Sequence, residues 1–159
     1  MISLFDLHSD TILEAYNQGC NIYDCNLQIS LKKANKFSPY KQVTSIWSDY
    51  RLDNDEAFEK ALKVIDYYKH LGFNFDGSSF ILGIEDARLL SGDISRLDTL
   101  YKFGLRVLTL NWKGFSIIGG GFDTDSGLSD FGKAVVLFVG APKQHRPNDE
   151  ECHRVEQVE

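Results

Sequence analysis

Four short apolar segments, separated by helical patterns, constrain the fold of this chain more than any other feature of its sequence. The segments occupy residues 2–7, 42–47, 80–84 and 105–110. Their length and composition predict buried strands, the first of them ending near His8. Nearly all-apolar strands that alternate with helices predict βα units around a parallel sheet. The expected class is therefore α/β, as half of a (β/α)8 TIM barrel or as a piece of an open doubly wound sheet.

Two helices are predicted between the later strands. The first includes residues 58–68, with acidic residues in front of it and Gly72 as its stop. The second lies around residues 94–101 and is closed by Gly104. Residues 114–132 are rich in glycine and predict an irregular loop. They lack the spacing of a phosphate-binding loop, so nucleotide binding is not expected there.

The composition and charge of the chain exclude several classes of partner. Of its 159 residues, 43% are hydrophobic and 13% aromatic, which is enough for a globular core. The formal net charge of −6 provides no attraction to nucleic acid or to an anionic membrane surface. The start shows no basic stretch before a long apolar one, and no run reaches membrane-spanning length, so we expect a cytoplasmic protein. Cys20, Cys25 and Cys152 show no C-x-x-C spacing, which argues against a disulfide framework and a thiolate zinc site.

His8 and Asp10, directly after the first predicted strand, are the leading candidates for metal ligands. Because residues i and i+2 of an extended segment point to the same side, their imidazole and carboxylate should converge. Both groups are good zinc ligands, and the carboxyl ends of parallel strands are where catalytic residues lie. Glu85 follows the third strand and should face the same edge of the sheet, where a carboxylate could bridge two ions. Such a site predicts hydrolysis by a metal-activated water.

Each candidate also has a purely structural interpretation. His8 would be a polar loop residue, and Asp10 with Thr11 would begin a helix. Glu85 would lie at a strand-to-helix turn and pair with Arg88. Three ligand-type residues at two strand ends favour the metal site over these interpretations. The chain has no G-x-S-x-G sequence, so a serine nucleophile is not expected.

Four stretches together resemble the renal-type membrane dipeptidase family of zinc dipeptidases, in order and in spacing. They are FDLHSDT at 5–11, LGIE at 82–85, GLRVLTLNW at 104–112 and DSGLSDFGK at 125–133. The combination covers roughly residues 1–136 and is far more specific than any one motif. The resemblance implies an amidohydrolase-like (β/α)8 TIM barrel of the metal-dependent hydrolase type, of which this chain would hold about the first half. It also implies hydrolysis of dipeptides at a centre of two zinc ions.

The resemblance assigns roles to individual residues. By motif, His8 and Asp10 would ligate one zinc ion, and Glu85 would bridge both. Trp112 stands where animal members carry a substrate-contacting histidine and where bacterial relatives often carry tryptophan, so it is a candidate for substrate binding. Asp86 stands where glycine is usual.

The family continues well past the length of this chain, with histidine ligands for the second zinc ion and a catalytic aspartate on later strands. His145 and His153 follow no strand pattern, so no ligand role is carried onto them, and His70 is expected only to cap its helix. Residues 137–159, with prolines and many charges, are expected to be a disordered tail after a domain of residues 1–136. The abrupt loss of resemblance predicts a frameshifted or prematurely ended reading frame.

Two interpretations of function follow from the sequence. In the first, the chain is a truncated zinc dipeptidase with impaired catalysis and a dipeptide substrate. In the second, it is a non-catalytic half-barrel remnant or an interaction protein. In both, a half barrel leaves sheet edges open and one apolar face uncovered, which predicts self-association.

Overall fold

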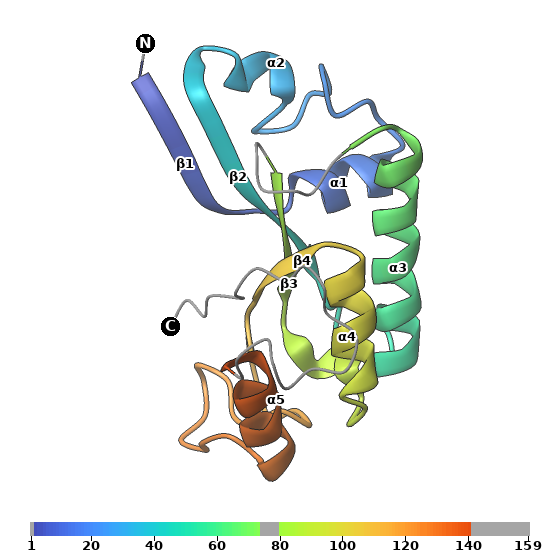
Figure 1. Ribbon diagram of the computed structural model, residues 1–159, viewed down its shortest axis with the longest axis vertical. Helices are drawn as coiled ribbons and strands as arrows, with labels where there is room; N and C mark the ends of the chain where they lie inside the picture. The colour runs from blue at the N-terminus through green and yellow to red at the C-terminus, as the bar shows by residue number, and fades with distance from the viewer. Residues whose placement is uncertain (1, 74–79, 141–159) are drawn as a thin grey trace.

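A four-stranded parallel sheet forms the centre of the fold (Figure 1). The computed structural model describes residues 2–73 and 80–140. The strands lie in the order of the sequence, and they are β1 (Ile2–Ser9), β2 (Phe37–Trp47), β3 (Phe80–Glu85) and β4 (Leu105–Leu108). Each of the four apolar segments of the sequence therefore forms a strand, and the predicted α/β class is confirmed.

Helices connect the strands, and α1, α3 and α4 lie together along one side of the sheet in Figure 1. The helical elements are α1 (Thr11–Gln18), α2 (Leu31–Ala34), α3 (Asn54–His70), the 3-10 turn η1 (Ala87–Leu90), α4 (Ser95–Lys102) and α5 (Asp130–Gly140). A doubly wound sheet reverses its strand order and carries helices on both faces. Strands in sequence order with helices on one side are the arrangement of successive units in a βα barrel.

Alternate side chains of the sheet face the helices and the opposite side. Ile46, Leu82 and Ile84 belong to the buried core that the sheet shares with α1, α3 and α4. Tyr68 of α3 closes this core, because its hydroxyl donates to the carbonyl oxygen of Ile12 at 2.9 Å. The residues between these positions on β2 and β3 face away from the core, and the candidate site lies on that face.

The 17-residue helix α3 forms where the sequence predicts it. Asp53 accepts a hydrogen bond from the backbone N–H of Glu56 at 2.8 Å, and the Glu56 carboxylate accepts from the N–H of Asp53 at 3.0 Å. This reciprocal pair satisfies two of the N–H groups that every helix start leaves unpaired. At the other end, Nδ1 of His70 donates to the carbonyl oxygen of Asp66 at 2.8 Å, and Gly72 follows with a φ of 79°.

The first strand differs from the prediction in its burial. Ile2, Phe5 and Leu7 are 73%, 51% and 61% exposed. Among the described residues, only β2 pairs with β1, which makes β1 an edge strand. The prediction that β1 is buried is therefore wrong, because an apolar run implies burial only when other elements cover the strand.

Several element boundaries also differ from the sequence pattern. β2 begins at Phe37 rather than near residue 42, and β4 ends at Leu108 rather than 110. The first four residues of the predicted disordered tail, 137–140, instead belong to α5. Residues 141–159, the rest of the predicted tail, lie outside the described residues. Within the described ranges, no helix is both long enough and apolar enough to cross a membrane.

Candidate metal centre

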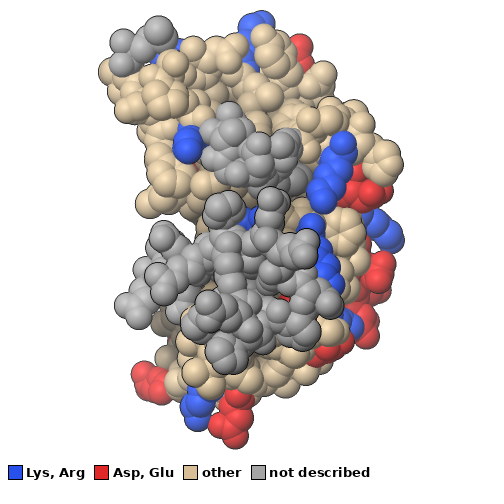
Figure 2. Space-filling view, in the orientation of Figure 1, with Lys and Arg blue, Asp and Glu red and all other residues tan. Residues whose placement is uncertain are grey.

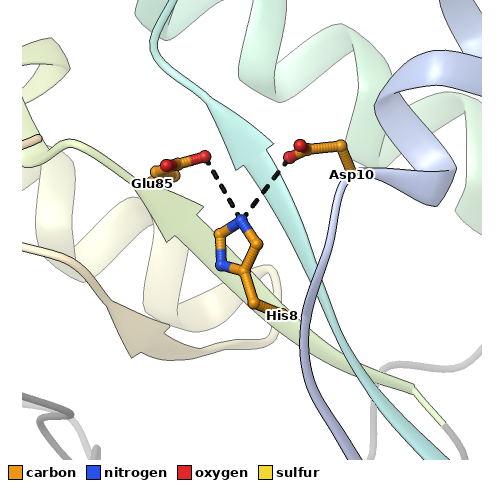
Figure 3. A group of neighbouring side chains, drawn as sticks. All are labelled: His8, Asp10 and Glu85. Carbon is orange, nitrogen blue, oxygen red and sulfur yellow. Dashed lines mark ion pairs between the residues drawn. The ribbon is translucent and has the colours of Figure 1, made fainter.

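Three ligand-type side chains meet on the face of the sheet opposite the core (Figure 3). His8 lies near the end of β1, Asp10 follows β1 at the start of α1, and Glu85 ends β3. Nε2 of His8 lies 3.3 Å from Oε2 of Glu85 and 3.9 Å from Oδ1 of Asp10. One potential ligand atom from each residue lies within 4.8 Å of the other two. The structure thus brings together the three candidates that the sequence indicates, from two strands separated by β2.

The structural interpretations of these residues hold only in part, because α1 does begin at Thr11. Asp10 precedes α1, yet its side chain makes no capping hydrogen bond. Its Oδ1 atom is buried and has no hydrogen-bond partner among the described residues. Glu85 makes no ion pair with Arg88, whose guanidinium instead donates to Oδ1 of Asn54 at 2.7 Å and to the carbonyl oxygen of Ser48 at 3.2 Å. Because buried carboxylate oxygens are normally paired, this oxygen of Asp10 could bind a cation.

The electrostatics of the group are compatible with a bound cation. Burial raises the pKa of the Asp10 carboxyl, while nearby His8 opposes that shift. Burial likewise raises the pKa of Glu85, with His8 opposing the shift and the Asp10 carboxylate adding to it. Each group is therefore harder to ionise than an exposed carboxyl. A divalent cation between them would remove this penalty, because an opposite charge favours the ionised form.

The donor set fits zinc. One imidazole nitrogen and two carboxylate oxygens are common zinc ligands, and ligand atoms of a tetrahedral zinc site lie about 3.3 Å apart. The separation of 3.3 Å between His8 and Glu85 matches this value, and the 3.9 Å between His8 and Asp10 is close to it. His8 and Asp10 are partly exposed, at 47% and 43%, so the group is accessible from solvent.

We expect Glu85→Gln to stabilise the metal-free chain at neutral pH. Because its pKa is raised by folding, the Glu85 carboxyl stays protonated in the folded chain at pH values where it is ionised in the unfolded chain. The free energy of unfolding therefore falls as the pH rises through this range. Glutamine has no charge to bury, so its advantage should be present at pH 7 and should vanish at acid pH, where both states of Glu85 are protonated. Thermal unfolding in excess chelator at several pH values measures the effect. A melting temperature below that of the wild type at pH 7 would contradict it.

A group of aromatic side chains stands beside the metal-site residues. Trp47 pairs in register with Glu85, and its ring contacts those of Tyr50 and Trp112 at centroid distances of 5.5 and 5.7 Å. Trp112 also stacks on Tyr50 at 6.4 Å. These rings border a pocket of about 290 Å³ that Asp86 also lines. Of this group, sequence reasoning identified only Trp112, although the position of Trp47 at a strand end could have marked it as well.

Asp86 stands where the resembled family usually has glycine, and its geometry shows how this chain accommodates an aspartate there. Its backbone has a φ of 74°, in the region that glycine enters most readily, and glycine is usual at this place in that family. The side chain stabilises the turn by accepting a hydrogen bond from the backbone N–H of Arg88 at 3.1 Å. Burial raises its pKa, opposed by hydrogen bonds from the backbone of Arg88 and Trp112. The turn at Asp86 therefore forms in this chain without glycine.

A second, polar cleft has a volume of about 680 Å³. His8 and Asp10 line it, together with Asp6, Glu14 and residues 26–29. His8 and Asp10 thus line the polar cleft, whereas Glu85 lies next to Asp86 and in register with Trp47, which both line the aromatic pocket.

The fold has a counterpart among solved structures. The chain is similar to the crystal structure of dipeptidase AC, a metallopeptidase, with a TM-score of 0.71 and 18% sequence identity over 86% of this chain and 53% of that chain. It thus spans about half the length of that dipeptidase. No family model and no curated protein matches the chain. At this identity the likeness concerns the fold alone, and the described residues have the α/β fold found in part of a metallo-dipeptidase.

Proposed function

We propose that this chain is a zinc-dependent dipeptidase whose metal is held by His8, Asp10 and Glu85. The observation that carries the proposal is the convergence of these three donors at the carboxyl ends of β1 and β3, with Oδ1 of Asp10 buried and without a hydrogen-bond partner among the described residues. The likeness in fold to a metallopeptidase that is a dipeptidase supports it. The partial barrel implied by the sequence resemblance agrees with the sequential strand order.

The three residues have distinct parts in the proposed chemistry. His8 would supply a neutral nitrogen and Asp10 a carboxylate oxygen, while the two oxygens of Glu85 would allow it to serve two ions. A zinc ion, when bound, lowers the pKa of water toward neutrality and polarises a carbonyl group. Within residues 2–73 and 80–140 there is no second group of three such ligands. A second ion would therefore need ligands from outside these residues or from a second copy of the chain.

The aromatic group would bind the substrate. Trp112 stacks on Tyr50 and contacts Trp47, so its ring is held in place beside the strand that ends at Glu85. Aromatic faces bind apolar side chains and peptide planes at little entropic cost, because their own torsions are few and already fixed. We assign the aromatic pocket to a side chain of the dipeptide.

An exposed apolar surface favours a second function, that of a non-catalytic interaction protein. Ile2, Phe5 and Leu7 of the edge strand β1 are exposed. In Figure 2, charged side chains gather at the right, over α3, whereas the upper left, over β1 and β2, is mostly uncharged. Open edges and apolar patches of this kind promote pairing with another chain.

Hydrolysis of dipeptides by the purified chain with added zinc tests the proposal. We expect release of free amino acids that stops on chelation and in Glu85→Ala, and a specific activity that rises with protein concentration if a second copy completes the site. Trp112→Ala should raise KM more than it lowers kcat, because its contact is made in the bound substrate as well as in the transition state.

Turnover that survives both chelation and Glu85→Ala would rule out this metal site as its origin. Zinc binding without turnover at any protein concentration would favour the non-catalytic function.

A further inference from the structure

Ser45 contacts the side of His8 that faces away from the carboxylates. It lies on β2, between the two strands that carry the metal-site residues, and it is 3% exposed. Its Oγ lies 3.4 Å from Nδ1 of His8. Nε2, the other ring nitrogen, faces Glu85 and Asp10. The two nitrogens of one imidazole therefore have different partners.

This difference decides where the ring carries its proton. A neutral imidazole carries a proton on one of its two ring nitrogens. A metal can bind only the other nitrogen, which has a free lone pair. A histidine that ligates zinc depends on an acceptor at its second nitrogen to fix its tautomer and orientation. We propose that Ser45 is a positioning residue for His8: its hydroxyl oxygen accepts a hydrogen bond from the Nδ1–H group of His8, which keeps the Nε2 lone pair directed toward Asp10 and Glu85. The proposal rests on the zinc site described above.

Gly83 makes room for this hydroxyl. It is the register partner of Ser45 on β3, and a Cβ atom at position 83 would lie 2.8 Å from Oγ of Ser45 and 3.1 Å from Cγ1 of Val43. Any side chain at position 83 would therefore push the hydroxyl from its place beside His8. The small residues at 45 and 83 therefore leave space for the contact between the Ser45 hydroxyl and the His8 ring.

The next residue on β2 provides a matched control. Thr44 is also buried and also carries a hydroxyl, but it points to the opposite face of the sheet. Its Oγ1 has no hydrogen-bond partner among the described residues. Thr44→Val removes a buried hydroxyl from the same strand without touching His8.

The test is the zinc affinity of the full chain, measured by competition with a chromogenic chelator, for wild type, Ser45→Ala, Ser45→Thr and Thr44→Val. Loss of a hydrogen-bond partner of a ligating histidine typically weakens metal binding about 10–100-fold. Because the 3.4 Å contact is long, we expect about tenfold for Ser45→Ala. Ser45→Thr should restore much of the affinity, and Thr44→Val should bind as the wild type does. The melting temperatures of the metal-free variants show whether the affinity changes without a change in folding.

Three outcomes would overturn the assignment. Ser45→Ala with wild-type affinity would show that His8 needs no such partner, although the zinc site itself would stand. Equal losses in Ser45→Ala and Thr44→Val would mean that any cavity in β2 has the same effect. A wild-type chain that binds no zinc would refute the metal site together with the role of Ser45.

Discussion

Replacing His8 with alanine should abolish zinc binding by the chain. His8 is the one nitrogen donor of the group and lies between the two carboxylates, within 3.3 and 3.9 Å of their oxygens. Loss of a residue that only hydrogen-bonds to a metal ligand weakens metal binding about 10–100-fold. Loss of the ligand itself should therefore weaken zinc binding by more than about 100-fold. Chelator competition or calorimetry with the metal-free protein measures the change.

His70→Ala is the matched control for this measurement. His70 is also paired with a carboxylate, since its Nδ1 lies 3.3 Å from Oδ1 of Asp66, but no third ligand-type residue joins the pair among the described residues. Its side chain is 76% exposed, so its removal should leave zinc binding unchanged. If His8→Ala bound zinc as tightly as the wild type and His70→Ala did not, the metal site would lie on α3 and not at the ends of β1 and β3.

Arg88→Ala should lower the free energy of unfolding by about 3 kcal/mol, because each buried acceptor that loses its donor costs about 1–3 kcal/mol. The guanidinium donates to the carbonyl oxygens of Ser48, Asp49 and Leu52, as well as to the side chain of Asn54. It therefore holds the segment that leads from β2 to α3. Urea unfolding followed by circular dichroism measures the loss.

Two further variants separate geometry from charge in this contact. Arg88→Lys keeps the charge but lacks the planar set of five donors, so most of the stability should remain lost. Arg51→Ala removes an arginine from the same segment, but Arg51 is 72% exposed and, within the described part of the chain, forms an ion pair only with Asp49, so its effect should be small. A lysine variant as stable as the wild type would mean that charge alone matters at position 88. Tyr50 lies in this segment, so the loss of Arg88 should also disturb the aromatic pocket.

The sequence contains much of the information about the metal-site candidates. His8, Asp10 and Glu85 each follow an apolar run closely, and parallel strands present their carboxyl ends at one edge of a sheet, so local pattern and a general rule are enough to bring them together. Helix α3 was predictable for a similar reason, since its cap, its apolar face and its stop all lie within one short stretch.

The features that escaped prediction depend on neighbours that are distant in the sequence. Helix α1 is short, and its stability comes from burial of Ile12 and Leu13 against the sheet and α3 rather than from its own polar residues. The exposure of β1 depends on whether other elements cover the strand, and its apolar sequence alone does not reveal this. The contacts of Ser45 with His8 and of Trp47 with Trp112 join residues 37 and 65 positions apart, and no spacing rule connects them.

The strand order β1-β2-β3-β4 has a consequence for how such a chain is made. Each strand pairs with the one that precedes it, so every new βα unit finds its partner among residues that have already left the ribosome. Folding can then advance with synthesis, in contrast to folds whose first strand waits for the last. A gene of this kind can also gain or lose its later units while the earlier strand pairs stay intact, which makes the edge of such a sheet a place where evolution can extend, shorten or divide a protein.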